Sequence, residues 1–208
     1  MDDALHPTAR ALVATTVAII EANGPQSVTI DKVLDASGIS RGSLYHHFGD
    51  FPSLVDHALL SIFRRYADAA VVELNAALEE LNSLASFRDG IHAIHAMNNT
   101  PEAARTRVIR TWAVAQALVR PSLRELLAEH QMGYNAALLA IIERGKERGW
   151  LRTEVDASSF ALLVQAYSFG TSLDELTDDH VDRAAYANLL DEVMVRTMFT
   201  DEARAALE

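Results

Sequence analysis

The chain has 208 residues, of which 50% are hydrophobic and 23% are charged, and its formal net charge is −11. This balance excludes a wholly disordered chain and leaves room for one or two domains with a sizeable core. The absence of cysteine excludes disulfides, thiolate metal sites and cysteine catalysis.

The acidic charge argues against nonspecific binding to nucleic acids or anionic membranes. No apolar run approaches the roughly 20 residues of a membrane helix, and the N-terminus is acidic where a signal peptide is basic. We therefore expect a cytoplasmic protein with no membrane partner.

The sequence predicts an all-α fold. Alanine and leucine are frequent, there are 9 glycines and 5 prolines, and no stretch alternates apolar and polar residues as a strand does. Glycine, proline and capping residues divide the chain into about nine helices. The expected helices span residues 8–23, 30–37, 41–47, 50 or 52 to about 81, 87–97, 101–119, 121 to about 149, 156 to about 176, and 181–199. The one plausible boundary lies at the start of the long helix, which gives domains of residues 1–51 and 52–208.

Two short helices joined by a glycine-containing turn form a helix-turn-helix pattern over residues 29–48. The apolar positions that would pack the two helices onto the first one are Ile30, Val33, Leu34, Ile39, Leu44 and Phe48. The second helix would present outward a set of donors and flat rings that suit base edges and phosphates, namely Arg41, Ser43, Tyr45, His46 and His47. Gly42 would let backbone N–H groups approach a phosphate. The alternative is a buried structural helix pair, but ordinary packing does not need so many polar and aromatic residues on one short face.

The segment over residues 28–48, VTIDKVLDASGISRGSLYHHF, resembles the DNA-binding signature of the TetR family of transcriptional regulators. The similarity covers about residues 8–56, and the remainder is similar only in architecture. The resemblance implies an N-terminal three-helix DNA-binding domain and a larger C-terminal helical domain for ligand binding and dimerisation. It also implies a homodimer, most simply a repressor, that a small-molecule effector releases from a palindromic operator in double-stranded DNA. The long helix, which touches both domains, would act as the lever.

Carried over by position, the resemblance implies a set of DNA-contacting residues: Thr29, Ser40, Arg41, Gly42, Ser43, Tyr45, His46 and His47. Of these, Tyr45 and His47 would contact mainly the phosphate backbone, and Arg41, Ser43 and His46 are better placed for bases. Phe51 stands where the family usually has lysine. Residues 1–50 contain three basic and six acidic residues, for a net charge of −3. Because few phosphates would be neutralised, we expect a shallow salt dependence of DNA binding.

The larger domain contains most of the aromatic residues, and its central helices are expected to enclose an apolar pocket with a few polar groups. The candidate effector-binding residues are His92, His95, Trp112, Gln116 and Tyr134. Taken singly, each aromatic residue is more often part of the core. We expect a neutral or cationic, largely hydrophobic ligand, because an anion would need Arg105, Arg107 or Arg110 to turn inward.

Two sets of residues have some metal-binding character. His92 and His95 lie three residues apart on one helix face, and His130 or a carboxylate could supply a third ligand. The acidic segment over residues 174–182, which includes His180, could bind a cation, although a solvated loop explains it more simply. Neither set is complete, so we predict no metal and no cofactor.

The last two predicted helices are apolar on more than one side and need cover on both. We expect them to form a four-helix bundle with a second copy through Phe160, Val164, Tyr167, Leu189, Leu190 and Val193. Burial within one subunit is the alternative. The competing function is a helical-bundle enzyme or a small-molecule binding module without DNA binding. No nucleophile elbow, phosphate-binding glycine loop or metalloprotease motif is present, so we predict no catalytic residues.

Overall fold

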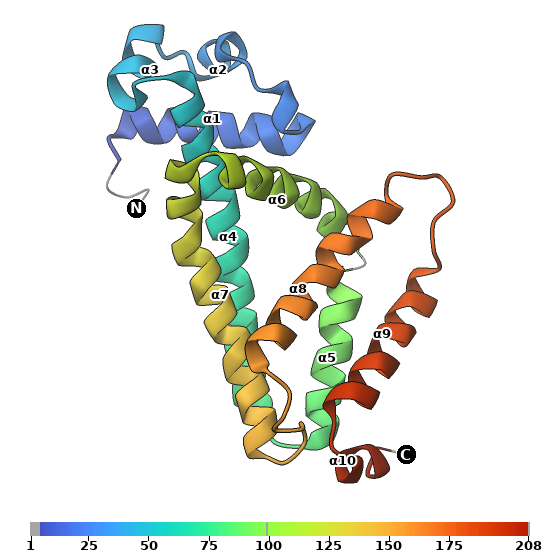
Figure 1. Ribbon diagram of the computed structural model, residues 1–208. Helices are drawn as coiled ribbons and strands as arrows, with labels where there is room; N and C mark the ends of the chain where they lie inside the picture. The colour runs from blue at the N-terminus through green and yellow to red at the C-terminus, as the bar shows by residue number, and fades with distance from the viewer. Residues whose placement is uncertain (1–4, 99, 208) are drawn as a thin grey trace. The chain divides into compact units, whose positions relative to one another are not determined.

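The computed structural model describes residues 5–98 and 100–207, and within these ranges it is helical with no strand (Figure 1). The α-helices are α1 (Pro7–Asn23), α2 (Ile30–Ser37), α3 (Arg41–Phe48), α4 (Phe51–Glu80), α5 (Leu84–Asn98), α6 (Pro101–Val119), α7 (Pro121–Glu147), α8 (Ala157–Asp174), α9 (Arg183–Met198) and α10 (Asp201–Ala205). The predicted all-α fold is confirmed. The prediction missed the single-turn 3-10 helix Pro25–Ser27 and α10, both of which are shorter than a sequence period can reveal.

The chain forms two compact units, and neither is continuous in sequence. Unit 1 contains residues up to 68 together with residues 109–131, and unit 2 contains residues 69–108 and 132–208. Helices α4, α6 and α7 therefore each contribute to both units. The predicted domain boundary between residues 51 and 52 falls at the first turn of α4 and stays a prediction.

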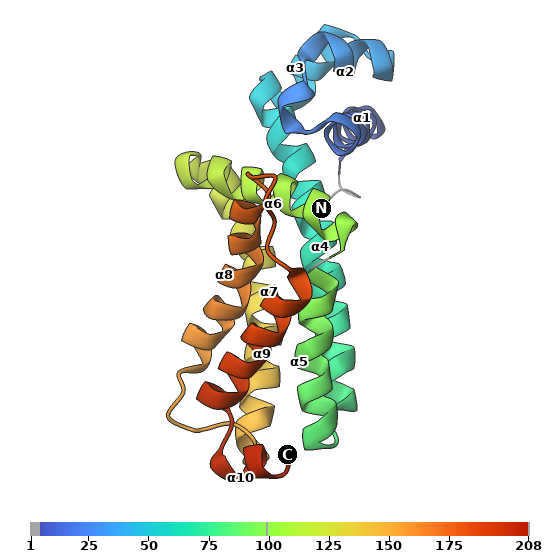
Figure 2. The ribbon, with the colours of Figure 1, turned by 90° about the vertical axis from the view of Figure 1, so that its right-hand side faces the viewer.

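Unit 1 has two apolar clusters. In the first, α1, α2, α3 and the start of α4 meet around Leu12, Val33, Leu44 and Leu54, all of which are completely buried. Helices α2 and α3 lie on the same side of α1 (Figures 1 and 2). The second cluster joins Ile20 of α1 to the next turns of α4 and to residues 109–127. The N-terminal helices, which we call the head (residues 5–50), are therefore packed as one body with parts of α4, α6 and α7.

Unit 2 is a helical bundle in which α8 and α9 pack beside α5 and the second half of α7 (Figure 2). Its core contains Phe87, Leu151 and Phe199, each at most 2% exposed. These three side chains come from α5, from the α7–α8 connection and from the end of α9, so the core joins segments that are far apart in the sequence.

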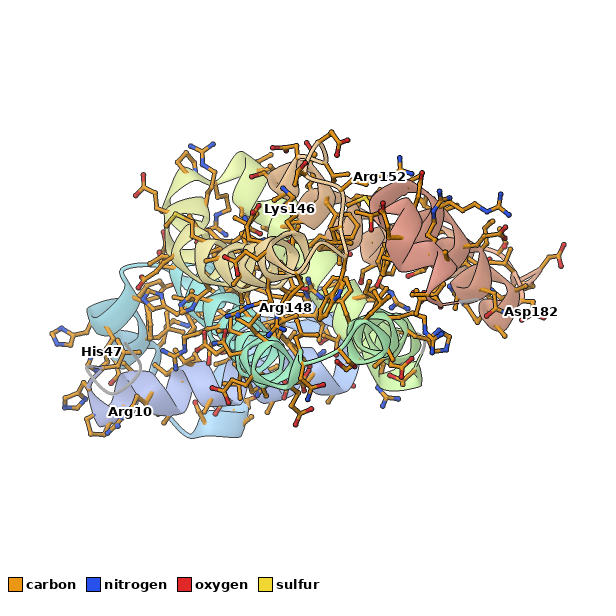
Figure 3. All side chains as sticks on the ribbon, turned by 90° about the horizontal axis from the view of Figure 1, so that it is seen from below. Arg10, His47, Lys146, Arg148, Arg152 and Asp182 are labelled. Carbon is orange, nitrogen blue, oxygen red and sulfur yellow. The ribbon has the colours of Figure 1, made fainter. Side chains whose placement is uncertain are left out.

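A tight turn after α7 holds this core together. Gly149 has φ +72, a left-handed conformation that favours glycine. Beyond it, Thr200 N donates to Trp150 O at 3.0 Å and Arg152 N donates to Met198 O at 2.9 Å, which forms an isolated bridge between the α7–α8 connection and the end of α9. Figure 3 labels Arg148 and Arg152 on the two sides of this turn.

Candidate nucleic-acid interface

The turn between α2 and α3 is set by Gly38. Its φ of +66 ends α2 in a left-handed cap, and its N–H donates to Leu34 O at 2.9 Å. The N–H of Ile39 then donates to the Ser37 hydroxyl at 3.2 Å, and Ile39 packs against the head core. These contacts fix the angle at which α3 leaves α2.

Helix α3 has one buried edge and one exposed face. Leu44 and Phe48 point into the head core and are 0% and 9% exposed. The predicted apolar set on α2, the turn and α3 belongs to this core, as expected. The opposite face carries Arg41, Gly42, Tyr45 and His46, all exposed, with Ser43 and His47 half-buried beside them. The predicted outward orientation of the polar and aromatic residues is thus confirmed, whereas their contacts with DNA stay a prediction.

Two of the predicted DNA-contacting residues, Thr29 and Ser40, are helix caps. Thr29 Oγ1 accepts from Lys32 N at 3.4 Å at the start of α2, and Ser40 Oγ accepts from Ser43 N at 3.2 Å at the start of α3. A hydroxyl that accepts from the backbone still has its own proton to donate. Both helix N-termini therefore combine a hydroxyl with backbone N–H groups and the positive end of the helix dipole, which suits a phosphate.

The head carries little free positive charge. Arg41 Nη2 donates to Asp31 Oδ1 at 2.7 Å, and Lys32 Nζ donates to Ser27 O at 3.0 Å. Phe51, the residue that replaces the usual lysine, packs against the head core. Sequence reasoning missed the Asp31 contact because the two residues lie on different helices, ten positions apart.

Three imidazoles gather at the end of α3. The His6 and His47 rings stack with centroids 5.0 Å apart, and the His46 and His47 rings meet edge-on at 5.1 Å. Burial lowers the pKa of His47 below its ordinary value, and the neighbouring His46 and His6 lower it further. The neutral form of His47 is therefore favoured in the free protein, and a nearby phosphate would oppose this shift.

The candidate effector residues are divided between the two units. Trp112 and Gln116 lie in unit 1, where Trp112 packs against the second apolar cluster. Tyr134 lies in unit 2 and packs against its core, and His92 is exposed there and pairs with Asp191. The side chain of His95 lies outside the described residues. The role of these five residues in effector binding stays a prediction.

A surface pocket of about 560 Å³ lies elsewhere in unit 2 and contains none of the predicted residues. It is lined by Arg88, Glu192, Val195, Arg196, Asp201, Arg204, Ala205 and Leu207. Its arginines each pair with a local carboxylate: Arg88 with Asp89, Arg196 with Glu192 and Arg204 with Asp201. Its charges are therefore already compensated within the chain.

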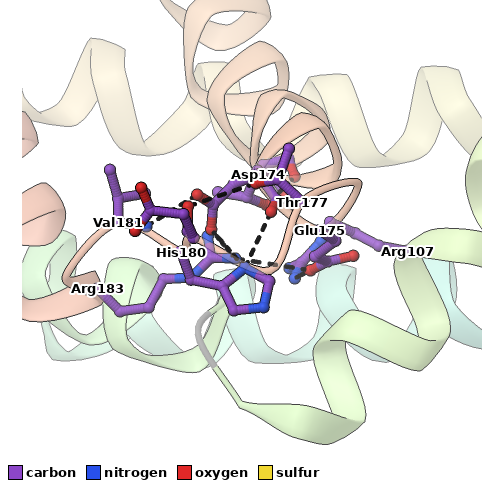
Figure 4. A network of polar contacts seen from close by, with 10 residues as sticks. Arg107, Asp174, Glu175, Thr177, His180, Val181 and Arg183 are labelled. Atoms are coloured by element: carbon purple, nitrogen blue, oxygen red, sulfur yellow. Dashed lines mark hydrogen bonds and ion pairs between the residues drawn. The ribbon is translucent and has the colours of Figure 1, made fainter.

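Arg107 is a buried cation of unit 2, and the sequence did not predict its position. Its side chain is 5% exposed and pairs with Glu175 at the end of α8, while Arg183 on α9 pairs with Asp174 at 2.8 Å (Figure 4). His180 Nδ1 lies 2.9 Å from Asp174 O. One of the arginines considered for an anionic ligand thus turns inward, but it meets a carboxylate of the chain itself.

The acidic segment over residues 174–182 is exposed from residue 176 onward, as expected of a solvated loop, and its two ends are held by polar contacts. Asp182 caps α9 through the N–H groups of Ala184 and Ala185 at 2.8 and 3.2 Å, and it lies at the N-terminal end of that helix in Figure 3. Among the residues that the structure describes, no group of three or more His, Asp or Glu side chains is arranged to hold a metal ion.

The six predicted dimer residues separate into three pairs by burial. Phe160 and Tyr167 are each 7% exposed and belong to the core of unit 2, so the structure corrects their predicted role as partner-facing residues. Val164 and Leu190 are half-buried against the same core. Leu189 and Val193 are exposed, as the prediction requires. Sequence reasoning missed Leu162 and Leu163, which are 67% and 51% exposed on α8.

Across the described part of the chain, no helix is long and apolar enough to cross a membrane.

Known proteins share both parts of this architecture. The family described as "Bacterial regulatory proteins, tetR family" matches residues 12–56, and the "BetI-type transcriptional repressor, C-terminal" matches residues 87–198. The HTH-type transcriptional regulator UidR of Escherichia coli is 20% identical over 195 residues, which cover 90% of this chain and 91% of UidR. The HTH-type transcriptional repressor KstR2 of Mycobacterium tuberculosis is 27% identical over 149 residues, which cover 70% of each chain.

Solved structures agree with this assignment. A transcriptional regulator from Saccharomonospora viridis in complex with choline is 18% identical, with a TM-score of 0.68 over 92% of this chain and 97% of that one. Salmonella enterica GusR is 20% identical, with a TM-score of 0.62 over 91% and 96%. These likenesses establish the fold, and the second family match spans more than half of the sequence. With a helix-turn-helix at its N-terminus and a matching C-terminal region, the chain belongs to the TetR family of transcriptional regulators.

Proposed function

We propose that this regulator is a repressor that binds an inverted-repeat operator as a homodimer, with α3 in the major groove. The observation that carries the proposal is the division of α3 into a buried edge, Leu44 and Phe48, and an exposed polar and aromatic face. A helix held by one edge can enter the major groove with its other face toward the bases.

Each residue of the exposed face has a role that follows from its chemistry. Arg41 is the donor best suited to a guanine edge, because a guanidinium offers two parallel N–H groups. Tyr45, which is 44% exposed, would donate its hydroxyl to a phosphate and pack its ring on the sugar. Thr29 and Ser40 would add their hydroxyls at the two helix N-termini.

The second copy would pack on the exposed apolar side of α8 and α9. The exposed residues on these helices, each at least 45% exposed, are Leu162, Leu163, Leu189 and Val193. The opposite side of each helix already packs in the core of unit 2. Burying such side chains is favourable by about 25 cal/mol for each Å² of apolar surface removed from water. A two-fold bundle would remove them from water and space the two α3 helices for successive major grooves.

The effector would be a small neutral or cationic molecule with a large apolar part. Because the buried Arg107 guanidinium is already paired with Glu175, an anionic ligand would have to displace a carboxylate. The choline complex of the Saccharomonospora viridis protein makes choline a sensible first probe. Since α4 contributes to both units, it is the natural lever, and a coupling of roughly 1–3 kcal/mol would change operator affinity about 5–150-fold.

Selection of binding sites from random duplex DNA tests the proposal. The wild type should enrich an inverted repeat, and Arg41→Ala and Tyr45→Phe should bind the selected duplex more weakly. Arg148→Ala, which removes an exposed arginine of unit 2, is the matched control and should bind as the wild type does. Enrichment of no sequence by the wild type would refute the proposal.

The effector is tested on the selected duplex. Choline and longer alkyl ammonium compounds should lower the affinity for DNA, whereas fatty acids of equal chain length should leave it unchanged. If only the fatty acids released the protein from DNA, the proposal of a neutral or cationic effector would be overturned.

A further inference from the structure

The cation of α3 is engaged by a carboxylate of the neighbouring helix. Asp31, in the first turn of α2, accepts from Arg41 Nη2 at 2.7 Å, and Arg41 is the first residue of α3. Both side chains remain open to solvent, 77% exposed for Asp31 and 53% for Arg41. The pair therefore spans the helix-turn-helix on its surface, and one member is the proposed base-reading arginine.

The contact uses a single nitrogen of the guanidinium. A guanidinium has five N–H donors, so Nε and Nη1 of Arg41 can still donate to DNA while Nη2 is held by Asp31. Exposed ion pairs are held weakly, so a phosphate could also displace Asp31. Arg41 thus has two ways to meet DNA, one that keeps the Asp31 contact and one that breaks it.

We propose that Asp31 is a specificity-determining residue of the DNA-binding surface, an inference that rests on the proposed function. In a complex with random DNA, a phosphate takes the place of Asp31 on Arg41, and the Asp31 carboxylate is left beside the phosphates. A complex with the right base lets Arg41 donate to the base edge from its remaining nitrogens while Asp31 keeps it in place. Asp31 thereby lowers the affinity for random DNA more than the affinity for the operator.

The chain supplies a matched control for this idea. Asp35 lies on the same helix and is also exposed, and within the described residues its carboxylate makes no ion pair. Asp35→Asn removes the same charge from the head as Asp31→Asn, but it leaves the Arg41 contact intact. The difference in DNA affinity between the two variants therefore measures the effect of the Asp31–Arg41 ion pair, separately from the effect of removing one negative charge.

The experiment measures fluorescence anisotropy of two labelled duplexes of equal length, the selected one and a random-sequence one, over a range of NaCl concentrations. Asp31→Asn should raise the affinity for the random duplex about 3–10-fold and steepen its salt slope by about one. The gain for the selected duplex should be smaller, so the ratio of the two affinities falls. Asp35→Asn should raise the affinity for both duplexes equally, by no more than about twofold. Thermal melting by circular dichroism checks that both variants fold as the wild type does.

A double-mutant cycle completes the test. On the Arg41→Ala background, Asp31→Asn should have only the effect of Asp35→Asn, because there is no guanidinium to release. The inference is overturned if the two aspartate variants behave alike with Arg41 present, or if the selected duplex gains as much as the random one. If the wild type enriches no sequence at all, the proposed function fails first and the inference falls with it.

Discussion

Two glycines of α7 allow one substitution to be tested in opposite environments. Gly133 and Gly145 both lie within α7 and in unit 2. A Cβ added at Gly133 would meet nothing within 4 Å, whereas one added at Gly145 would lie 2.9 Å from both Leu151 Cδ1 and Phe87 Cζ. The same Gly→Ala change should therefore stabilise the protein at one site and strain its core at the other.

The magnitudes follow from two terms. Replacing a helical glycine by alanine gains about 0.5–1 kcal/mol, since alanine loses less conformational freedom on folding. At Gly145 this gain is offset by overpacking, which costs about 1–3 kcal/mol when neighbours cannot move. Leu151 is pinned by its N–H bond to Gly145 O at 3.2 Å, and the Phe87 ring is confined between Trp150 and Phe199. We therefore expect the unfolding free energy of Gly145→Ala to lie about 1–3 kcal/mol below that of Gly133→Ala.

Urea denaturation of the full chain, followed by far-ultraviolet circular dichroism, measures this difference as a shift in midpoint. Gly133→Ala should raise the midpoint and Gly145→Ala should lower it or leave it unchanged. Equal upward shifts in both variants would refute the packing of Leu151 and Phe87 against α7.

Three further predictions concern charge, proton binding and assembly. Glu175→Gln should lower the unfolding free energy by roughly 2–4 kcal/mol in the same urea assay, because it removes the carboxylate charge that pairs with the buried Arg107. A loss under about 0.5 kcal/mol would contradict this. The pKa of His47 is lowered in the free protein and would rise beside a phosphate, so the complex would bind more protons than the free protein does. Operator affinity should therefore strengthen as pH falls from 7.5 to 6.0. His47→Asn should flatten this pH dependence, and an unchanged slope would exclude His47 as its source. In sedimentation experiments, Leu189→Glu should weaken the dimer at least about tenfold. The control Leu118→Glu, at a 71% exposed site of α6, should leave the dimer unchanged. If the two variants behaved alike, α9 would not be part of the dimer interface.

Local signals explain where the helix boundaries could be predicted. The range of α2 follows from the Thr29 cap and Gly38, and that of α6 from the prolines at residues 101 and 121, so both agree with expectation to the residue. Helix α5 begins three residues earlier than predicted. Ser83 and Ser86 cap each other there, with N–H to hydroxyl bonds of 3.2 and 3.1 Å, in a segment that composition alone indicates as a break.

Contacts between distant helices explain what the sequence could not predict. An apolar pattern on more than one side of α8 predicts burial but not which side meets the chain's own core. Phe160 and Tyr167 proved to be inside, while Leu162 and Leu163 are outside. The inward turn of Arg107 depends in the same way on Glu175, which is 68 residues away.

In the proposed complex, the acidic head would make the dimer more important for DNA binding than it is for a strongly basic repressor. Each head has few cations to exchange for the counterions of DNA, and Arg41 is shared with Asp31. A single head would therefore bind weakly, and the second head would gain from the high effective concentration that the proposed dimer provides. It follows that Leu189→Glu should abolish operator binding at protein concentrations where the wild type is saturated, even though Leu189 lies on α9 in unit 2. If the monomeric variant kept its operator affinity, the head would have to hold DNA by contacts other than those of α2 and α3.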